Sequence, residues 1–138
     1  MVRIQNLIKQ REQLQVKYEQ TLRLAPSKIT VKSPDEIFIK KALEVVDQNL
    51  SNSEFTVEAF QKEIGMSRMQ LHRKLKALTN FSASEFIRDI RLQRASDLLA
   101  GNGLNVTEVA YSCGFNSVSY FTQCFKQKFG MSPSSYKT

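Results

Sequence analysis

Cationic and hydrogen-bonding side chains cluster in one short segment, and their types could recognise a polyanion. Arg68, His72 and Arg73 lie within six residues of one another, directly after Ser67. Guanidinium, imidazole and hydroxyl groups can donate hydrogen bonds to phosphate oxygens and to base edges. Residues 64–84 and 109–138 contain no acidic residue, so carboxylates that would repel phosphates are kept out of two separate segments. A basic face that is merely solvated remains an alternative at this point.

The same residues give little support for a catalytic or metal site. His72 is the only histidine in the chain, and no Ser or Cys accompanies it in a recognisable triad order. The sequence has no glycine-rich phosphate loop and no paired-carboxylate motif. Cys113 and Cys124 are too few for a disulfide framework and lack zinc-ligand spacing, which indicates reduced, packed thiols. We therefore expect no enzyme activity, no cofactor and no metal.

The length and composition of the chain are those of a folded protein domain. The chain has 138 residues, of which 41% are hydrophobic and 24% charged, as is usual for one folded domain. The net charge of +7 is uneven: residues 1–33 carry +5, 34–63 carry −4 and 64–138 carry +6. No apolar stretch is long enough to span a bilayer, and the N-terminus has no apolar signal region. We therefore expect a cytoplasmic protein whose residues here make no membrane contact.

The chain repeats itself, and the repeat predicts its architecture. Five residues recur 49 positions later: Val57, Phe60, Ile64, Gly65 and Met66 as Val106, Val109, Cys113, Gly114 and Phe115. After one extra residue, Asn116, five more recur 50 positions later: Ser67, Leu71, Leu75, Ser82 and Phe86 as Ser117, Phe121, Phe125, Ser132 and Tyr136. Each copy has a helical pattern, a turn that contains glycine and a second helical pattern, which is typical of a helix-turn-helix.

The expected fold class is all-α, with two tandem, homeodomain-like helix-turn-helix subdomains joined by a long spacer helix and preceded by an extra N-terminal helix. The first helix-turn-helix is predicted over about 56–79, the spacer over about 83–100 and the second over about 106–129. A capping box at Ser33 and Glu36 predicts a further helix from Pro34 to about Leu50. Its expected apolar stripe is Ile37, Ala42, Leu43, Val45, Val46 and Leu50.

The spacer helix is expected to present a charged face to solvent. That face carries Arg88, Arg91 and Arg94. Three carboxylates lie on the same helix, and we expect them to form ordinary surface pairs with these arginines: Glu85, Asp89 and Asp97.

Residues 1–33 are expected to form a separate N-terminal helix and linker. Residues 3–24 have a weak helical stripe interrupted by Arg11, and 25–32, with Pro26 and Ser27, break the pattern. The stripe could pack on a neighbouring domain or pair with a second copy, or the helix could be a solvated connector. These alternatives stay open.

Helical periodicity places different side chains on the exposed faces of the two second helices. In the first repeat, Met69, Arg73 and Lys76 lie opposite Leu71, Leu75 and Leu78, with Arg68 and His72 flanking. Met69 could contact a thymine methyl or be simply exposed. In the second repeat, Ser119, Gln123 and Lys126 lie opposite Phe121, Phe125 and Phe129, which are expected in the core rather than as a platform for stacking bases. We expect the first repeat to discriminate bases more than the second.

Residues 36–137 resemble the AraC/XylS-type DNA-binding domain. The resemblance is carried by segments of both repeats and the spacer: 65–67, 87–99 with Arg91, Ala95 and Leu98-Leu99, 108–110, Gly114-Phe115, 119–121, Phe125-Lys126, Phe129-Gly130, Pro133 and Tyr136. Both repeats, their separation and the closing Gly-x-x-Pro-x-x-Tyr pattern agree with the pattern of this family. Gln61 departs from the alanine that is common in the family.

The resemblance implies a sequence-specific transcription regulator that binds a double-stranded DNA operator and contacts RNA polymerase, with two recognition helices in successive major grooves. The implied base readers are Arg68, Met69, His72 and Arg73 in the first helix and Ser117, Val118, Ser119, Thr122 and Gln123 at the second. The expected phosphate contacts are Ser67, Lys74, Lys76, Asn116 and Lys126.

A narrower resemblance concerns residues 3–46. Residues 3–24, followed by 32–36 and Val45-Val46, resemble the connector between a receiver domain and this DNA-binding domain in hybrid two-component regulators of Bacteroides-type bacteria. It implies that residues 1–33 connect residues 34–138 to a receiver domain, in a parent that is a sensor histidine kinase and dimerises through other domains. The competing interpretation of the chain is a helical module for protein–protein interaction or dimerisation.

Overall fold

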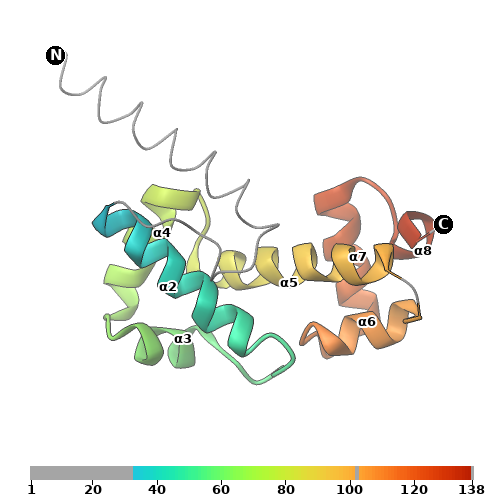
Figure 1. Cartoon of the computed structure of the whole chain (residues 1–138), viewed down its shortest axis with the longest axis horizontal. Helices are drawn as coiled ribbons and strands as arrows, with labels where there is room; N and C mark the ends of the chain where they lie inside the picture. The colour runs from blue at the N-terminus through green and yellow to red at the C-terminus, as the bar shows by residue number, and fades with distance from the viewer. Residues whose placement is uncertain (1–32, 102, 138) are drawn as a thin grey trace, which may run out of the picture. The chain divides into compact units, whose positions relative to one another are not determined.

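The structure, a computed structural model, describes residues 33–101 and 103–137, and every element in these ranges is a helix (Figure 1). The helices are α2 (Pro34–Gln48), α3 (Val57–Ile64), α4 (Arg68–Thr79), α5 (Ala83–Ala100), α6 (Val106–Ser112), α7 (Val118–Phe129) and α8 (Pro133–Lys137). The predicted all-α class is confirmed. The expected N-terminal helix and linker lie outside the described residues. Within the described part of the chain, no helix is both long and apolar enough to cross a membrane.

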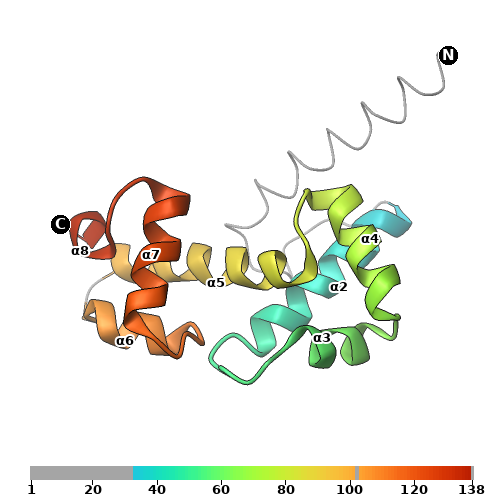
Figure 2. The same ribbon diagram turned by 180° about the vertical axis from the view of Figure 1, so that it is seen from behind.

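The described residues divide into two compact units. Unit 1 contains residues 33–47 and 56–87, and unit 2 contains residues 48–55 and 88–137. Each unit holds one of the predicted helix pairs, α3 and α4 in unit 1 and α6 and α7 in unit 2 (Figure 2). Helix α5 contributes to both, because its residues up to Ile87 belong to unit 1 and those from Arg88 belong to unit 2.

Unit 1 buries the apolar stripes of its helices. Phe60 of α3 and Phe86 of α5 are fully buried and stack with ring centroids 5.8 Å apart. In α2 the buried residues are Phe38, Ile39, Ala42, Leu43, Val45 and Val46. The prediction for Ile37 was wrong, since this side chain is 55% exposed. At 100° per residue, Ile37 points away from the stripe that Ala42 and Val46 define.

Unit 2 is built around an aromatic core. Phe121 and Phe125 of α7 are fully buried, with ring centroids 5.7 Å apart. Phe115 lies 5.0 Å from Phe121, and Tyr136 of α8 packs edge-on against Phe125 at 5.3 Å. Helix α8 was not predicted from the sequence, because a five-residue helix has too few positions to show a period. These contacts fix α7 by its inner face and leave its outer face exposed.

Candidate nucleic-acid interface

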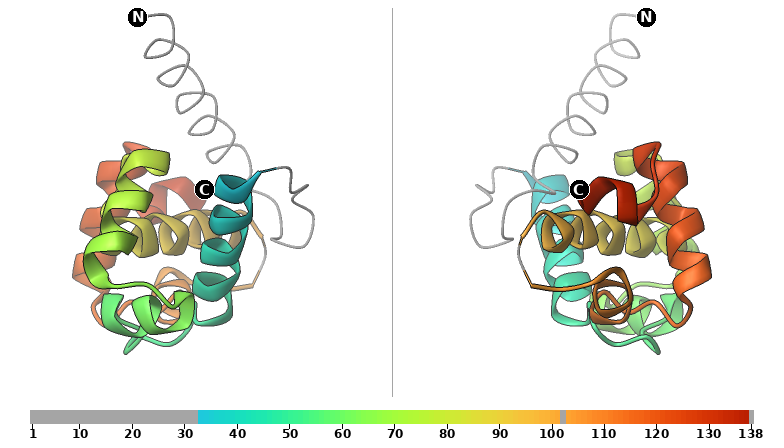
Figure 3. Two further views of the ribbon diagram at one scale, coloured as in Figure 1. Left: turned by 90° about the vertical axis from the view of Figure 1, so that its left-hand side faces the viewer. Right: turned by 90° about the vertical axis from the view of Figure 1, so that its right-hand side faces the viewer.

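A left-handed glycine and a capping box position α4. Gly65 ends α3 at φ +80°, a backbone conformation that favours glycine, and its N–H donates to the Gln61 carbonyl at 2.9 Å. Ser67 then caps α4: its Oγ accepts from the Gln70 N–H at 3.2 Å, and the Gln70 Oε1 accepts from the Ser67 N–H at 3.1 Å. Figure 3, left, shows α3 and α4 joined by this turn. The turn therefore sets which face of α4 is exposed.

The exposed face of α4 carries the side chains that the periodicity predicts. Leu71, Leu75 and Leu78 are buried. Five side chains on the opposite face and its flanks are exposed: Arg68, Met69, His72, Arg73 and Lys76. Met69 is 63% exposed. The face combines hydrogen-bond donors with one apolar contact.

A groove beside α4 adds residues that the sequence pattern did not indicate. It is lined by Arg68, Met69 and His72 of α4 together with Val57, Ser82, Ala83 and Ser84. Ser82 caps α5, because its Oγ accepts from the Glu85 N–H at 3.2 Å and the Glu85 carboxylate accepts from the Ser82 N–H at 2.9 Å. No sequence signal identifies these residues as part of the site, since only the packing of α5 within unit 1 brings them to α4.

Two predicted phosphate contacts of unit 1 already have partners within the chain. The Nζ of Lys74 lies over the Phe38 ring, 4.8 Å from its centroid, and the side chain is half-buried. The Nζ of Lys76 donates to the Asn80 carbonyl at 3.0 Å, at the C-terminal end of α4. Each ammonium has three N–H donors, so these contacts position the two cations and still leave donors for a phosphate.

The turn of the second repeat is longer than the first and is built on Gly114. Its φ is +85°, and its N–H donates to the Tyr111 carbonyl at 3.1 Å. The following residue, Phe115, donates its N–H to the Ala110 carbonyl at 3.0 Å. Ser117 begins α7, with its Oγ accepting from the Tyr120 N–H at 3.2 Å. The extra residue Asn116 is exposed in this turn.

The outer face of α7 is polar and carries little charge. Ser117, Ser119, Gln123 and Lys126 are exposed, whereas Val118 and Thr122 are half-buried. Phe121 and Phe125 are fully buried, so these two rings cannot stack on a base. Among the described residues, no group of three or more His, Cys, Asp or Glu side chains could hold a metal ion.

Arg91 does not lie on an exposed charged face, as the sequence suggested, but ties two loops of unit 2 together. Its Nη2 donates to the Asn52 carbonyl at 2.9 Å and its Nη1 to the Gly114 carbonyl at 3.3 Å. Burial lowers the pKa of this guanidinium, and burial raises the pKa of the neighbouring Cys113 thiol to about 11. Cys113 is therefore a protonated core residue and not a reactive thiol.

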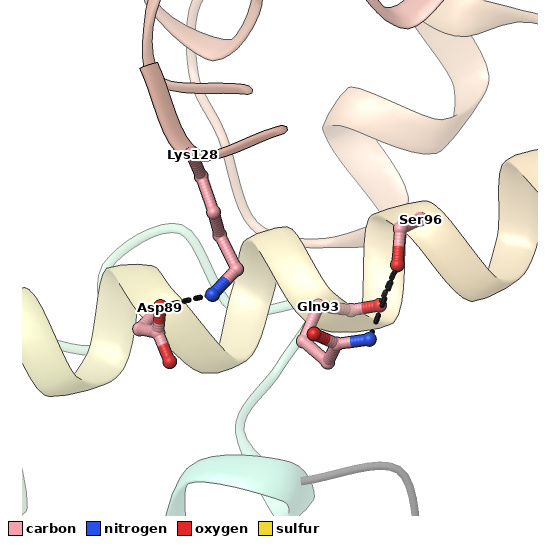
Figure 4. Close-up of polar contacts among 4 residues, drawn as sticks. All are labelled: Asp89, Gln93, Ser96 and Lys128. Atoms are coloured by element: carbon pink, nitrogen blue, oxygen red, sulfur yellow. Dashed lines mark hydrogen bonds and ion pairs between the residues drawn. The ribbon is translucent and has the colours of Figure 1, made fainter. Parts of the chain in front are cut away.

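Asp89 corrects a second expectation. It was expected to pair with arginines on the surface of the spacer helix, but its side chain is buried and forms an ion pair with Lys128 of α7 (Figure 4). The pairing arises because α7 packs across α5 in unit 2, a long-range contact that the spacing along α5 does not reveal. Arg94 and Asp97 do form a pair within α5, at 3.8 Å.

Comparisons with known proteins indicate a helix-turn-helix protein. A family model described as a helix-turn-helix domain matches residues 60–138. Histidine kinase P4 of Formosa agariphila is 43% identical over 99% of this chain, and the chain spans only 10% of the length of that kinase.

Two solved structures share the fold. The crystal structure of a DNA-binding transcriptional dual regulator from Escherichia coli K-12 has a TM-score of 0.68 and 31% identity, covering 79% of this chain and 95% of its own. The DNA-binding domain of AdpA, a global transcriptional factor solved in complex with a target DNA, has a TM-score of 0.64 and 29% identity, covering 77% of this chain and 91% of its own.

Proposed function

This chain belongs to the AraC-type helix-turn-helix family of DNA-binding domains of transcription regulators, and we propose that α4 and α7 read a specific operator in double-stranded DNA. The observation that carries this proposal is the presence in each unit of a capped helix whose inner face is packed and whose outer face is exposed and polar. In a helix-turn-helix, the second helix enters the major groove. We propose that the two helices enter successive grooves of one operator.

The proposed base readers are the exposed residues of these faces together with the half-buried Val118 and Thr122. On α4 they are Arg68, Met69, His72 and Arg73, and at α7 they are Ser117, Val118, Ser119, Thr122 and Gln123. Arginine can bond guanine in a bidentate manner, and glutamine can do the same with adenine. The proposed phosphate contacts are Ser67, Lys74, Lys76, Asn116 and Lys126, and the two lysines of α4 keep donors for a phosphate beside their intrachain contacts.

The proposed context is the output end of a two-component protein. Its support is the identity with a histidine kinase along nearly the whole of this chain. In such a parent, a receiver domain precedes residues 1–33, kinase chemistry belongs to other segments, and the parent dimerises through domains outside this chain. The proposed downstream partner is RNA polymerase. We assign no catalytic step to the residues described here.

Selection of bound sequences from a random duplex pool, at two salt concentrations, tests the proposal. Enrichment of a motif with two patches about one helical turn apart supports operator reading by two helices. Binding that is steeply salt-dependent but enriches no motif contradicts sequence-specific reading. Absence of binding at low salt favours the interaction module instead.

Arg73→Ala is expected to weaken binding to the selected operator by about 1–3 kcal/mol, because Arg73 is exposed in the middle of the α4 face. Binding to random duplex should fall much less. Lys62→Ala is a control of equal charge, since Lys62 pairs with Glu58 on the exposed surface of α3. Fluorescence anisotropy titrations on both duplexes measure the effect. Equal weakening on operator and random DNA would show that Arg73 contacts phosphate and not a base.

Ser67→Ala and Ser67→Asp separate the capping role of Ser67 from its proposed phosphate contact. The alanine variant loses the cap of α4, so its free energy of unfolding should be lower by about 1 kcal/mol. Aspartate restores a capping oxygen, so the stability of Ser67→Asp should match the wild type, while its charge repels phosphate and weakens DNA binding. Urea denaturation and DNA titration report the two effects. Full DNA affinity in Ser67→Asp argues against the phosphate contact.

A further inference from the structure

We propose that Asp35 of α2 is a specificity residue of the α4 interface, where its carboxylate opposes non-specific phosphate contacts beside Arg73. The proposal rests on the proposed function, because it concerns how the same face of α4 distinguishes an operator from other duplex DNA. Asp35 and Arg73 both belong to unit 1. Asp35 is not among the contacts predicted from the sequence.

The fold brings a carboxylate to a helix that has none of its own. Residues 64–84, which include α4, contain no acidic residue. Asp35 lies in the first turn of α2 and lines a hollow of about 430 Å³, whose wall on α4 includes Gln70, Arg73 and Lys74. Arg73 and Lys74 follow Gln70 by three and four positions, so all three residues share one side of α4. The absence of acids along this segment therefore does not hold for its surroundings in space.

A second contact holds the beginning of α2 against this side of α4. The Nζ of Lys74 lies over the Phe38 ring, 4.8 Å from its centroid. Phe38 is buried and follows Asp35 by three positions, which places both residues on one side of α2. Asp35 is exposed and forms no ion pair in the described part of the chain. Its charge therefore makes the hollow less positive than the two cations of α4 alone would make it.

The effect of this charge depends on what Arg73 binds. On random duplex, Arg73 has phosphates to bind, and these are anions that a carboxylate repels. On the operator, Arg73 is proposed to bond the O6 and N7 atoms of guanine, which are uncharged acceptors. Lys74 is proposed to contact phosphate in both complexes, so the effect of Asp35 on Lys74 cancels from the ratio of the two affinities. Asp35 therefore lowers the affinity for random duplex more than the affinity for the operator.

The test measures the affinities of D35N and D35E for the selected operator and for random duplex over a range of salt concentrations. We expect D35N to raise the affinity for random duplex by about threefold to fivefold and to change that for the operator by less than about 1.5-fold. The slope of log K against log salt on random duplex should steepen by up to about 0.9, the value for one phosphate. D35E keeps the charge, so its ratio of operator to random affinity should remain that of the wild type.

E44Q is the matched control, because it removes the same charge from the same helix. Glu44 does not line the hollow, and it follows Asp35 by nine residues, or about 13 Å along the helix axis. That separation exceeds the Debye length of about 10 Å at 0.1 M ionic strength. E44Q should therefore leave the ratio of operator to random affinity unchanged. A fall in this ratio equal to that of D35N would overturn the proposal, because the effect would then come from net charge.

A double-mutant cycle tests whether Asp35 acts through Arg73. In the R73A background, D35N should leave the ratio of operator to random affinity unchanged, because the group that changes its partner is gone. The same fall in the ratio with and without Arg73 would overturn this route. Thermal denaturation of each variant checks folding. Should D35N unfold, D35S removes the same charge and takes its place in every comparison.

The outcomes separate this proposal from the proposed function. Failure of the wild-type chain to enrich any motif refutes operator reading, and this proposal with it. Enrichment of a motif together with an unchanged ratio in D35N overturns the role of Asp35 alone. Enrichment of a motif together with a lower ratio in D35N, and with wild-type ratios in D35E and E44Q, supports it.

Discussion

Gly114→Ala is expected to lower the free energy of unfolding by about 2–5 kcal/mol. A Cβ atom at this position would lie 2.4 Å from the Leu50 carbonyl oxygen and 2.9 Å from Cζ of Arg91. One obstacle is backbone and the other belongs to a guanidinium anchored on two carbonyls, so neither can retreat easily. The left-handed φ of +85° adds about 1–2 kcal/mol for any residue with a Cβ, and overpacking adds about 1–3.

Gly65→Ala and Gly130→Ala are the matched controls. Both glycines have a positive φ, of +80° and +77°, but a Cβ at either would meet nothing within 4 Å. They should therefore show the backbone cost of about 1–2 kcal/mol without the steric cost. Urea denaturation followed by circular dichroism measures all three. A Gly114→Ala variant no less stable than the two controls would mean that the contacts with Leu50 and Arg91 relax freely.

Lys128→Met is expected to destabilise the chain by about 2–4 kcal/mol. The side chain of Asp89 is only 9% exposed and that of Lys128 is 24% exposed. Removing the lysine leaves a carboxylate buried without its partner, which typically costs about 3–5 kcal/mol in a fully buried pair, and the partial exposure of Lys128 reduces this figure.

Two further variants test the origin of that loss. Asp89→Asn should cost less than Lys128→Met, because the more exposed lysine can turn to solvent. Lys62→Met removes the lysine of a pair whose side chains are both 73% exposed, and should change stability by less than about 0.5 kcal/mol. Thermal and urea unfolding compare the three. Equal losses in Lys128→Met and Lys62→Met would show that burial of Asp89 contributes nothing.

The features that sequence reasoning predicted are those that depend on neighbouring residues. The start of α2 depends on Ser33 and Glu36, which are three positions apart, and the exposed face of α4 follows from helical periodicity. The internal repeat gave independent support, because two copies of one pattern set the helix boundaries twice. For these reasons α2 to α7 and the outward direction of the candidate base readers on α4 could be predicted from the sequence.

The features that could not be predicted from the sequence depend on contacts between distant segments. Arg91, Asp89 and Arg88 lie within four residues of one another and look alike as a charged helix face. They bond to partners 23 to 39 residues away, and each faces a different environment: backbone carbonyls for Arg91, the partly exposed Lys128 for Asp89 and the hydroxyl of Tyr120 for Arg88. Periodicity gives the direction in which a side chain leaves its own helix. It does not identify which other element of the chain packs against that side chain.

The discontinuous make-up of the two units imposes an order on folding during synthesis. Unit 1 has its full set of described residues once the chain reaches Ile87. The segment 48–55 is made much earlier than its partners, because the donor to the Asn52 carbonyl is Arg91 and the turn against Leu50 is formed by Gly114. During synthesis this segment can form only its local hydrogen bonds, such as that from the Phe55 N–H to the Asn52 carbonyl, until about sixty further residues have been added. Its polar composition, Ser51-Asn52-Ser53-Glu54, suits that interval in water.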